Sequence, residues 1–439
     1  MKFKFILQFI FLYCCSLQCL FGSQGDTLYL KKGFKQLSSD AKEVYFFTKE
    51  DLNIQDLQSK EFKGLKETHF SYISGTLWVR LIIKNNDCAQ NRFVLHISDA
   101  HLSGVYIYKP VGDTYEMSPA KQYHPEDGRE IFTRIPAFFI ELEKGQAKTF
   151  YIKIISNNEV TNFNYIIEDS VHYYKSLQLD SFIIALYWGA LIIMIIINIF
   201  YYVSLKDSLF LIYSFYVFAC LMLSATFEGF FWLFVPNQDL AYHLNFFSIR
   251  LWPDALLFFT VHLVNLKAYN RKLTKIAYGF MIYHTILMNI IEAFNIFNNR
   301  GAYMEQWETL NMGIGILLTC FVILKSYKNN KYLFKYYLIA YGVLLFVFSF
   351  AVFHGASAEN WLVFEHGMKV GTLVEIITLS FAVSRRFRLT ENDLKLKKEE
   401  EKQFNEKIKE LETNVRKAQM NPHFMFNALT SIEYFISKK

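Results

Sequence analysis

Seven apolar runs fill residues 179–383, and they limit the possible fold more than any other feature of the sequence. Each run is close to the roughly 20 residues that an α-helix needs to cross a bilayer core. Helices are the expected spanning form, because unpaired backbone polar groups are too costly in lipid. The sequence therefore predicts a seven-helix membrane bundle over residues 179–386. Its runs are Leu179–Ser204, Leu209–Phe227, Asn245–Leu266, Ile276–Phe297, Trp307–Ser326, Tyr336–Phe353 and Trp361–Val383.

The charges of the loops predict the orientation of this bundle. Loops 205–208, 267–275 and 325–335 and the segment after the last run are rich in Lys and Arg, whereas the three intervening loops hold only Arg300. Basic residues collect on the cytoplasmic side of membrane proteins. We therefore expect the N-terminal region to lie outside the cytoplasm and the C-terminus inside it.

Composition argues against several other classes of function. The formal net charge of +6 comes largely from the basic loops, so it indicates no nucleic-acid partner. Three cysteines lie in the first 25 residues and two in apolar runs, which leaves Cys88 alone and predicts no disulfide framework. The histidines show no metal-ligand spacing, so we expect no metal site.

Residues 1–25 are typical of a secretory signal peptide. Lys2 and Lys4 precede the short apolar run Phe5–Tyr13, and small and polar residues follow. An eighth spanning helix is the alternative, but the run is short and a segment of soluble character follows it.

Residues 26–175 change to short runs rich in Val, Ile, Phe and Tyr, bounded by Asn, Asp, Gly and Pro. Such runs, without helical patterns between them, predict an N-terminal all-β antiparallel sandwich. The predicted strands are Leu77–Ile83, Phe93–Ser98, Val105–Lys109, Phe138–Leu142, Thr149–Ile155 and Phe163–Glu168. The predicted turns are 85–87, 110–113 and 143–146, and residues 51–62 are expected to form a short helix.

Beyond the bundle, residues 387–418 are highly charged and predict a cytoplasmic helix. Its apolar residues are spaced four and three apart, at Phe404, Ile408, Leu411, Val415 and Ala418. This is the a/d pattern of a coiled coil, although it covers only about two heptads. A solvated amphipathic helix and a parallel dimer both fit the pattern.

Residues 419–439 carry the candidate chemistry. Asn421 suits a helix N-cap and Pro422 suits the first helical position, so a helix is expected to begin here. His423 would then lie in the first turn, where the helix dipole disfavours a cationic imidazolium. A neutral imidazole keeps a lone pair for phosphoryl attack. Without further context, a structural histidine is the alternative.

The run Gln419–Ile432 resembles the phosphoacceptor motif of the LytS-like sensor histidine kinases, Q-x-N-P-H-F-x-F-N-x-L-x-x-I, at every fixed position. By that resemblance His423 is the phosphorylated residue. The supporting motif residues, which shape its helix and its meeting with an ATP-binding domain, are Asn421, Pro422, Phe424 and Asn427. That family continues with an ATP-binding domain that holds Mg-ATP, which this sequence lacks. We therefore expect no cofactor in this chain and no autophosphorylation unaided. The chain would be truncated, split or phosphorylated in trans.

The bundle resembles the bacterial seven-helix receptors with diverse intracellular signalling modules, the 7TM-DISM family. The resemblance rests on residues 181–202, with Gly189 and Asn198, and on residues 375–386, with Glu375 and the exit arginines. The β region resembles the second type of extracellular domain of that family, at residues 77–80, 93–108 and 135–136. The family implies a location in the bacterial inner membrane, with multiple passes.

This type of extracellular domain implies binding of an extracellular small molecule, such as a carbohydrate. The candidates for stacking on a sugar ring are Trp78, Tyr106, Tyr108, Tyr115, Tyr123 and His124. For Trp78, a residue in a predicted strand, a place in the sandwich core is the favoured alternative.

Ionisable residues in the runs are further candidates, because such groups are costly in a membrane. Glu375 is expected either to transmit the signal, with Arg385 and Arg386 at the helix exit, or to fix packing through His354, His284 or a helix backbone. Arg250 and Asp254 are expected to pair across one helical turn.

These features predict the membrane sensor of a two-component system. A ligand outside would act through the bundle and the coiled coil of a homodimer on His423, and phosphate would pass to a response regulator. A non-catalytic receptor or regulatory partner is the alternative. A transporter ranks third, because paired broken helices and an inverted hydropathy repeat are lacking.

Overall fold

The computed structural model describes most of the chain between Thr27 and Lys438. The described residues are 27–30, 36–37, 44–49, 52–60, 62–64, 69–86, 90–97, 102, 104–121, 128–162, 165–290, 304–354 and 358–438. The predicted signal peptide and the ligand candidates Tyr123 and His124 lie outside them. The chain divides into two compact units, Met1–Leu379 and Ser380–Lys439.

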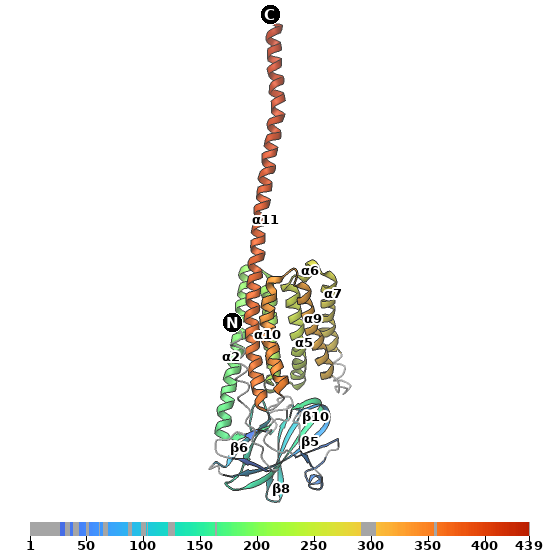
Figure 1. The fold of residues 1–439 in the computed structure, drawn as a ribbon, viewed down its shortest axis with the longest axis vertical. Helices are drawn as coiled ribbons and strands as arrows, with labels where there is room; N and C mark the ends of the chain where they lie inside the picture. Colours follow the sequence, from blue (N-terminus) through green and yellow to red (C-terminus); the bar gives the residue numbers. More distant parts are fainter. Residues whose placement is uncertain are drawn as a thin grey trace. The chain divides into compact units, whose positions relative to one another are not determined.

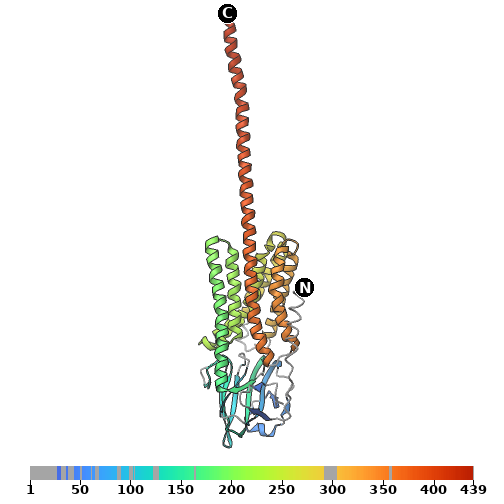
Figure 2. The ribbon, with the colours of Figure 1, turned by 60° about the vertical axis from the view of Figure 1, so that its left-hand side comes forward.

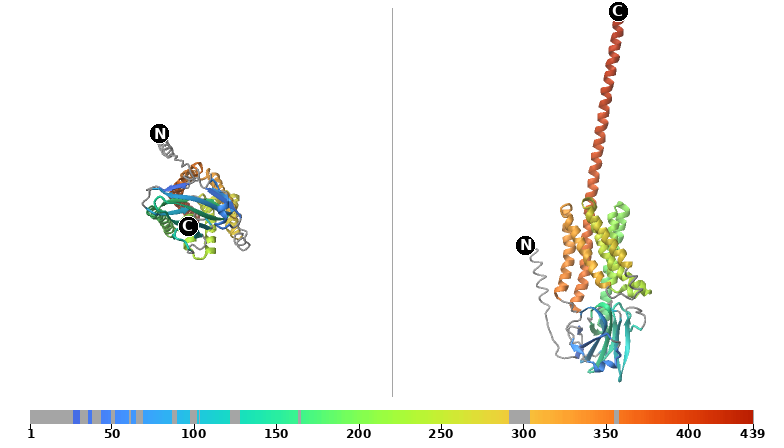
Figure 3. Two further views of the ribbon diagram at one scale, coloured as in Figure 1. Left: turned by 90° about the horizontal axis from the view of Figure 1, so that it is seen from below. Right: turned by 90° about the vertical axis from the view of Figure 1, so that its right-hand side faces the viewer.

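The described residues before Ser170 form two β-sheets, drawn in blue to green in Figures 1 and 3. The larger sheet has the order β4-β3-β5-β10-β7-β8, with β1 paired to β5, and the smaller has the order β2-β11-β6-β9. The larger contains β1 (Thr27–Leu30), β3 (Val44–Thr48), β4 (Lys63–Gly64), β5 (His69–Asn85), β7 (Gly104–Val111), β8 (Thr114–Lys121) and β10 (Ala147–Asn162). The smaller contains β2 (Gln36–Leu37), β6 (Arg92–Ile97), β9 (Ala137–Glu141) and β11 (Tyr165–Asp169). We call residues 27–169 the β domain.

Alternation along the strands builds the core of the β domain. On β5, Leu77, Val79, Leu81 and Ile83 join one apolar cluster with buried residues of the smaller sheet. Trp78 belongs to a second cluster, with Leu57 and Tyr151. The two clusters lie on opposite faces of β5, because successive strand side chains point to opposite sides.

The six predicted strands are confirmed, but three features differ from the prediction. Five further strands, β1, β2, β3, β4 and β8, lie outside the six predicted ranges, and β8 was missed because its sequence contains Glu116, Ser118 and Pro119. Proline is tolerated there because β8 is the edge strand of its sheet. The pairing of β1 with β5 is parallel, not antiparallel. The helix expected at 51–62 is a single 3-10 turn, Asp56–Ser59.

The helices of the first unit run side by side in Figures 1 and 2. Five described helices are long and apolar enough to cross a membrane. The helical segments are α2 (Ser170–Leu205), α3 (Ser208–Phe227), α4 (Phe230–Phe234), α5 (Gln238–Leu263), α6 (Leu266–Tyr269), α7 (Arg271–Ile282), the π-helix η3 (Tyr283–Leu287), α9 (Met304–Ser326), α10 (Lys331–His354) and α11 (Ala358–Ser437).

These five helices correspond to the first, second, third, fifth and seventh apolar runs. The fourth run falls on α7 and η3 and continues into residues that the structure does not describe. The sixth run falls on α10. A membrane protein is therefore confirmed, whereas the count of seven spans stays a prediction.

Small residues let the helices approach closely. A Cβ atom added to Gly371 of α11 would lie 2.9 Å from Leu344 of α10, and one added to Gly367 would lie 3.0 Å from Val347. A Cβ atom on Gly315 of α9 would lie 3.2 Å from Pro253 of α5. Close backbone packing of this kind replaces the hydrophobic effect as the source of helix association in lipid.

The second unit is the later part of α11, from Ser380 onward. Its residues 401–417 and 422–438 are exposed. A helix over 387–418 is confirmed. We call the apolar residues at the a/d positions of this helix the seam, and the four of them with described side chains, Phe404, Ile408, Leu411 and Val415, are exposed to solvent.

Replacing Trp78 with Ala tests its place in the core. We expect a loss of about 3–5 kcal/mol in the free energy of unfolding of the β domain, because a fully buried aromatic side chain leaves a cavity. Hydrogen exchange of β5 and β10 against urea, in the full chain, measures this loss. Tyr106→Ala, at a partly exposed position, is the matched control. Equal losses in the two variants would contradict a core role for Trp78.

Candidate functional site

His423 lies on an exposed face of α11, one turn before Asn427. The His423 Nδ1 atom is 3.1 Å from the Asn427 Nδ2 atom. Phe424 and Phe426 beside it are also exposed. The described motif side chains therefore present an accessible imidazole with an amide partner on the same helix.

The predicted helix start at Asn421 is wrong. The helix runs without interruption from Ala358 to Ser437, and Pro422 lies inside it. Asn421 is thus not an N-cap, and the dipole argument for a neutral His423 fails because the histidine is not in a first turn. Proline has no amide hydrogen, so the helix lacks one backbone hydrogen bond at this point.

The stacking candidates of the β domain separate into two groups. Trp78 is fully buried, with its ring 5.2 Å from the ring of Tyr108. Tyr115 packs edge-on against Tyr151, with ring centroids 5.4 Å apart. Tyr106 and Tyr108 instead line a cavity of about 440 Å³. Trp78 is therefore a core residue, and two of the predicted tyrosines reach a site that could hold a small molecule.

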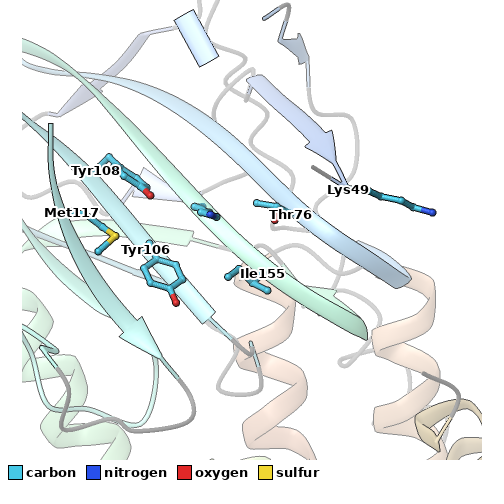
Figure 4. A pocket seen from close by; sticks show the side chains of 7 residues that line it. Lys49, Thr76, Tyr106, Tyr108, Met117 and Ile155 are labelled. Carbon is cyan, nitrogen blue, oxygen red and sulfur yellow. The ribbon is translucent and has the colours of Figure 1, made fainter. Parts of the chain in front are cut away.

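This cavity opens on the outer face of the larger sheet (Figure 4). Its other lining residues are Lys49, Thr76, Met117, Lys153 and Ile155. The Lys153 ammonium lies 5.4 Å from the centre of the Trp78 ring, within the range of a cation–π contact. The polar lining thus consists of two ammonium groups and three hydroxyl groups, and it contains no carboxylate.

Glu375 is buried in the first unit, but its partner is not one of those expected. The Tyr216 hydroxyl, on α3, donates to Glu375 Oε1 at 2.6 Å. His284 is bound to Asp254 instead, and the His354 side chain lies outside the described side chains. The neighbouring Tyr213 hydroxyl donates to the carbonyl of Ile376. Two tyrosines of α3 therefore hold α11 by its backbone and by its buried carboxyl.

The expected pair between Arg250 and Asp254 is replaced by contacts to other helical segments. Arg250 Nε donates to Glu308 Oε1 of α9 at 2.7 Å, and its Nη1 donates to Asn289 at 2.6 Å. Asp254 accepts from Thr285 and lies 3.0 Å from His284 Nδ1, both on η3. These contacts tie α5, η3 and α9 together beside Pro253.

A second charged group, not predicted from the sequence, joins the β domain to the helices. Arg134, between β8 and β9, donates to Asp180 of α2 and to Glu228 at the end of α3. Glu228 also lies 2.6 Å from Lys369 of α11. The sequence does not predict that these four residues meet, because contacts between residues so far apart in the chain follow no regular spacing.

Glu130 is a partly buried carboxylate in the same segment as Arg134. It accepts hydrogen bonds from Lys109, from Ser118 Oγ at 2.5 Å and from the Phe139 amide at 2.9 Å. Burial alone raises the pKa of Glu130, but these hydrogen bonds outweigh it and hold that pKa below its ordinary value.

Three family models match the chain, in the predicted order. Residues 40–165 match 7TMR-DISM extracellular 2, residues 180–386 match 7TM diverse intracellular signalling, and residues 411–439 match the histidine kinase model. None of the curated proteins compared with the chain matches it. Within the described residues, no group of three or more His, Cys, Asp or Glu side chains could hold a metal ion.

The Glu130→Gln variant tests the charge of this carboxylate through pH. Because the pKa of Glu130 is lower in the folded state, its charge stabilises the fold at any pH above the pKa of the unfolded state. This stabilisation is lost as the pH falls through the pKa of the folded state. We expect the variant to lose on the order of 1–2 kcal/mol at pH 7 and to approach the parent protein as the pH drops below 4.5, the ordinary value.

Hydrogen exchange of β7 to β9, compared between variant and parent at each pH, measures this difference. Glu143→Gln, in the exposed turn after β9, is the control and should show little change at either pH. A difference for Glu130→Gln that is the same at both pH values would overturn the assignment.

Proposed function

We propose a function from one premise: this chain is a receptor of the 7TMR-DISM family joined to the start of a histidine-kinase domain. Receptors with that domain order serve as membrane sensors in two-component systems and imply a response regulator as partner. We infer that the β domain binds a small molecule outside the cytoplasm and that α11 carries the response to His423. The charges of the loops support this orientation.

His423 is the proposed phosphoacceptor, and the observation that carries this proposal is its exposed imidazole beside Asn427. In the contact as it stands, the Asn427 amide nitrogen donates to Nδ1. Rotation of the carboxamide by half a turn presents its oxygen to Nδ1 instead, which holds the proton there and leaves the Nε2 lone pair free. Attack by Nε2 on the γ-phosphorus of ATP forms an N–P bond and breaks the P–O bond to ADP. The acceptor aspartate of a response regulator then takes the phosphoryl group.

A homodimer is the arrangement that would cover the exposed seam. Phe404, Ile408, Leu411 and Val415 lie on one face at a/d spacing and are all exposed in the single chain. Pairing with a second copy would bury these side chains and bring two phosphoacceptor helices together.

The chemistry of the cavity favours an acidic sugar as ligand. Tyr106 and Tyr108 offer ring surface for a sugar face, and the ammonium group of Lys153 favours a carboxylate, whereas the Lys49 side chain points away from these tyrosines in Figure 4.

Phosphotransfer is tested with the full chain in membranes, Mg and labelled ATP, with and without a separately supplied ATP-binding domain of a LytS-like kinase. We expect label on the chain when that domain is supplied, and a loss of at least about a hundredfold in His423→Gln, because the nucleophile is removed. His172→Gln, at an exposed histidine of α2, should keep its label. Absence of label under both conditions would favour a non-catalytic receptor.

The ligand class is tested by the thermal unfolding of the full chain with galacturonate and with galactose. We expect galacturonate to raise the melting temperature and galactose to have a smaller effect, because stabilisation grows with affinity for the folded state. Lys153→Gln should remove the difference between the two sugars, whereas Lys148→Gln, on the same strand but outside the cavity, should keep it. Equal effects of both sugars on the parent chain would exclude an acidic ligand of this kind.

A further inference from the structure

Residues 128–136 are the described part of the connection between β8 and β9, and they contact both the cavity strands and the helices. Within this segment, Arg129 Nη1 donates to the Thr133 carbonyl at 2.6 Å, and Thr133 Oγ1 donates to the Ile135 carbonyl at 2.9 Å. The Thr133 hydroxyl also lies 3.5 Å from the Tyr173 hydroxyl of α2. The segment is therefore braced by its own hydrogen bonds.

The first end of the segment is attached to the strands that line the cavity. Glu130 Oε1 accepts from both Lys109 of β7 and Ser118 of β8. These two residues directly follow the cavity residues Tyr108 and Met117 in the chain. A change in the spacing of β7 and β8 at the cavity therefore acts directly on the Glu130 carboxylate.

The second end of the segment is attached to the helices through one shared carboxylate. Arg134 binds Glu228 Oε2, while Lys369 of α11 lies 2.6 Å from Glu228 Oε1. The side chains of Arg134, Glu228 and Lys369 are 14%, 4% and 8% exposed, so water screens these charges poorly. Asp180 completes a group of two cations and two anions whose charges balance.

The backbone holds Glu228 in place between its two cations. Glu228 ends α3, and its amide donates to the Ser224 carbonyl at 3.0 Å. Gly229 follows with φ of +69°, the left-handed conformation that glycine adopts readily. Glu228 is thus a fixed bridge between Arg134 and Lys369, while Asp180 contacts Arg134 alone within the described part of the chain.

We propose that residues 128–136 are the coupling element between the cavity and α11, acting in the order Glu130, Arg134, Glu228 and Lys369. This proposal rests on the proposed role of the cavity as the ligand site. A ligand that shifts β7 against β8 moves the braced segment and, with it, the Arg134 guanidinium. Because Arg134 and Lys369 share the Glu228 carboxylate, Glu228 and Lys369 follow the guanidinium, and Lys369 belongs to the helix that carries His423.

The experiment perturbs one end of this route and measures the other, without a ligand and without phosphotransfer. Glu130→Gln weakens the attachment to β7 and β8, and hydrogen exchange of residues 366–379 of α11 is the readout in the full chain in nanodiscs. We expect an exchange rate at least about threefold faster than in the parent, which lies within the range for residues coupled through one network. Failure of the ligand or kinase assays would leave this result unaffected.

Two matched variants, used as backgrounds for the Glu130→Gln change, test whether the coupling between the cavity and α11 passes through Glu228. In Glu228→Gln, the Glu130→Gln change should have no further effect on α11, whereas in Asp180→Asn the effect should persist. A purely structural role for Arg134 predicts that both carboxylate variants behave alike. The proposal is overturned if the effect survives in Glu228→Gln or disappears in both backgrounds. Lys109→Gln perturbs the same end and replaces Glu130→Gln if that variant does not fold.

Discussion

Lipid offers no hydrogen-bond partner, so polar side chains within the helical region must be satisfied by other parts of the protein. Glu375 meets Tyr216, Arg250 meets Glu308, and Glu228 meets both Arg134 and Lys369. Removing one member of such a buried pair costs about 3–5 kcal/mol, because the other charge stays buried. Each contact is therefore a directional link between two segments and resists any movement that would separate its partners.

The junction between the β domain and α2 is also held by short polar contacts. Asp169 is both the last residue of β11 and the N-cap of α2, where its side chain accepts from the His172 amide at 2.9 Å. Beside it, the buried Glu168 carboxylate lies 3.1 Å from His96 and accepts from Ser176 at 3.3 Å. Strand and helix share this junction without a linker between them.

The histidine motif depends on its environment in a different way. In a continuous helix, His423 loses the support of a helix N-terminus, and the neighbouring Asn427 becomes the group that sets its tautomer. The missing amide of Pro422 leaves a local weakness one residue before the histidine. A proline at this position allows the helix to bend near His423 with little further loss of backbone hydrogen bonding.

The sequence by itself determined the properties that arise from local periodicity. Apolar runs of membrane length indicated the spanning helices, alternation indicated the six predicted strands, and the motif around His423 indicated the kinase part, because each signal lies within a short stretch of chain. Predictions from local residue preferences were wrong where tertiary contacts or the continuing helix override those preferences. Examples are Pro422, which lies inside α11, and the edge strand β8, which contains Pro119.

Only the tertiary structure decided which residues meet across large separations in the chain. Trp78 became a core residue because residues 52–62 cover that face of β5, whereas Tyr106 and Tyr108 were left to line a cavity. Glu375 contacts Tyr216, and Arg134 contacts Glu228, because distant segments of the chain pack together. No regular spacing in the sequence predicts these contacts. Such pairings depend on how whole sheets and helices pack, and that packing is a property of the complete fold.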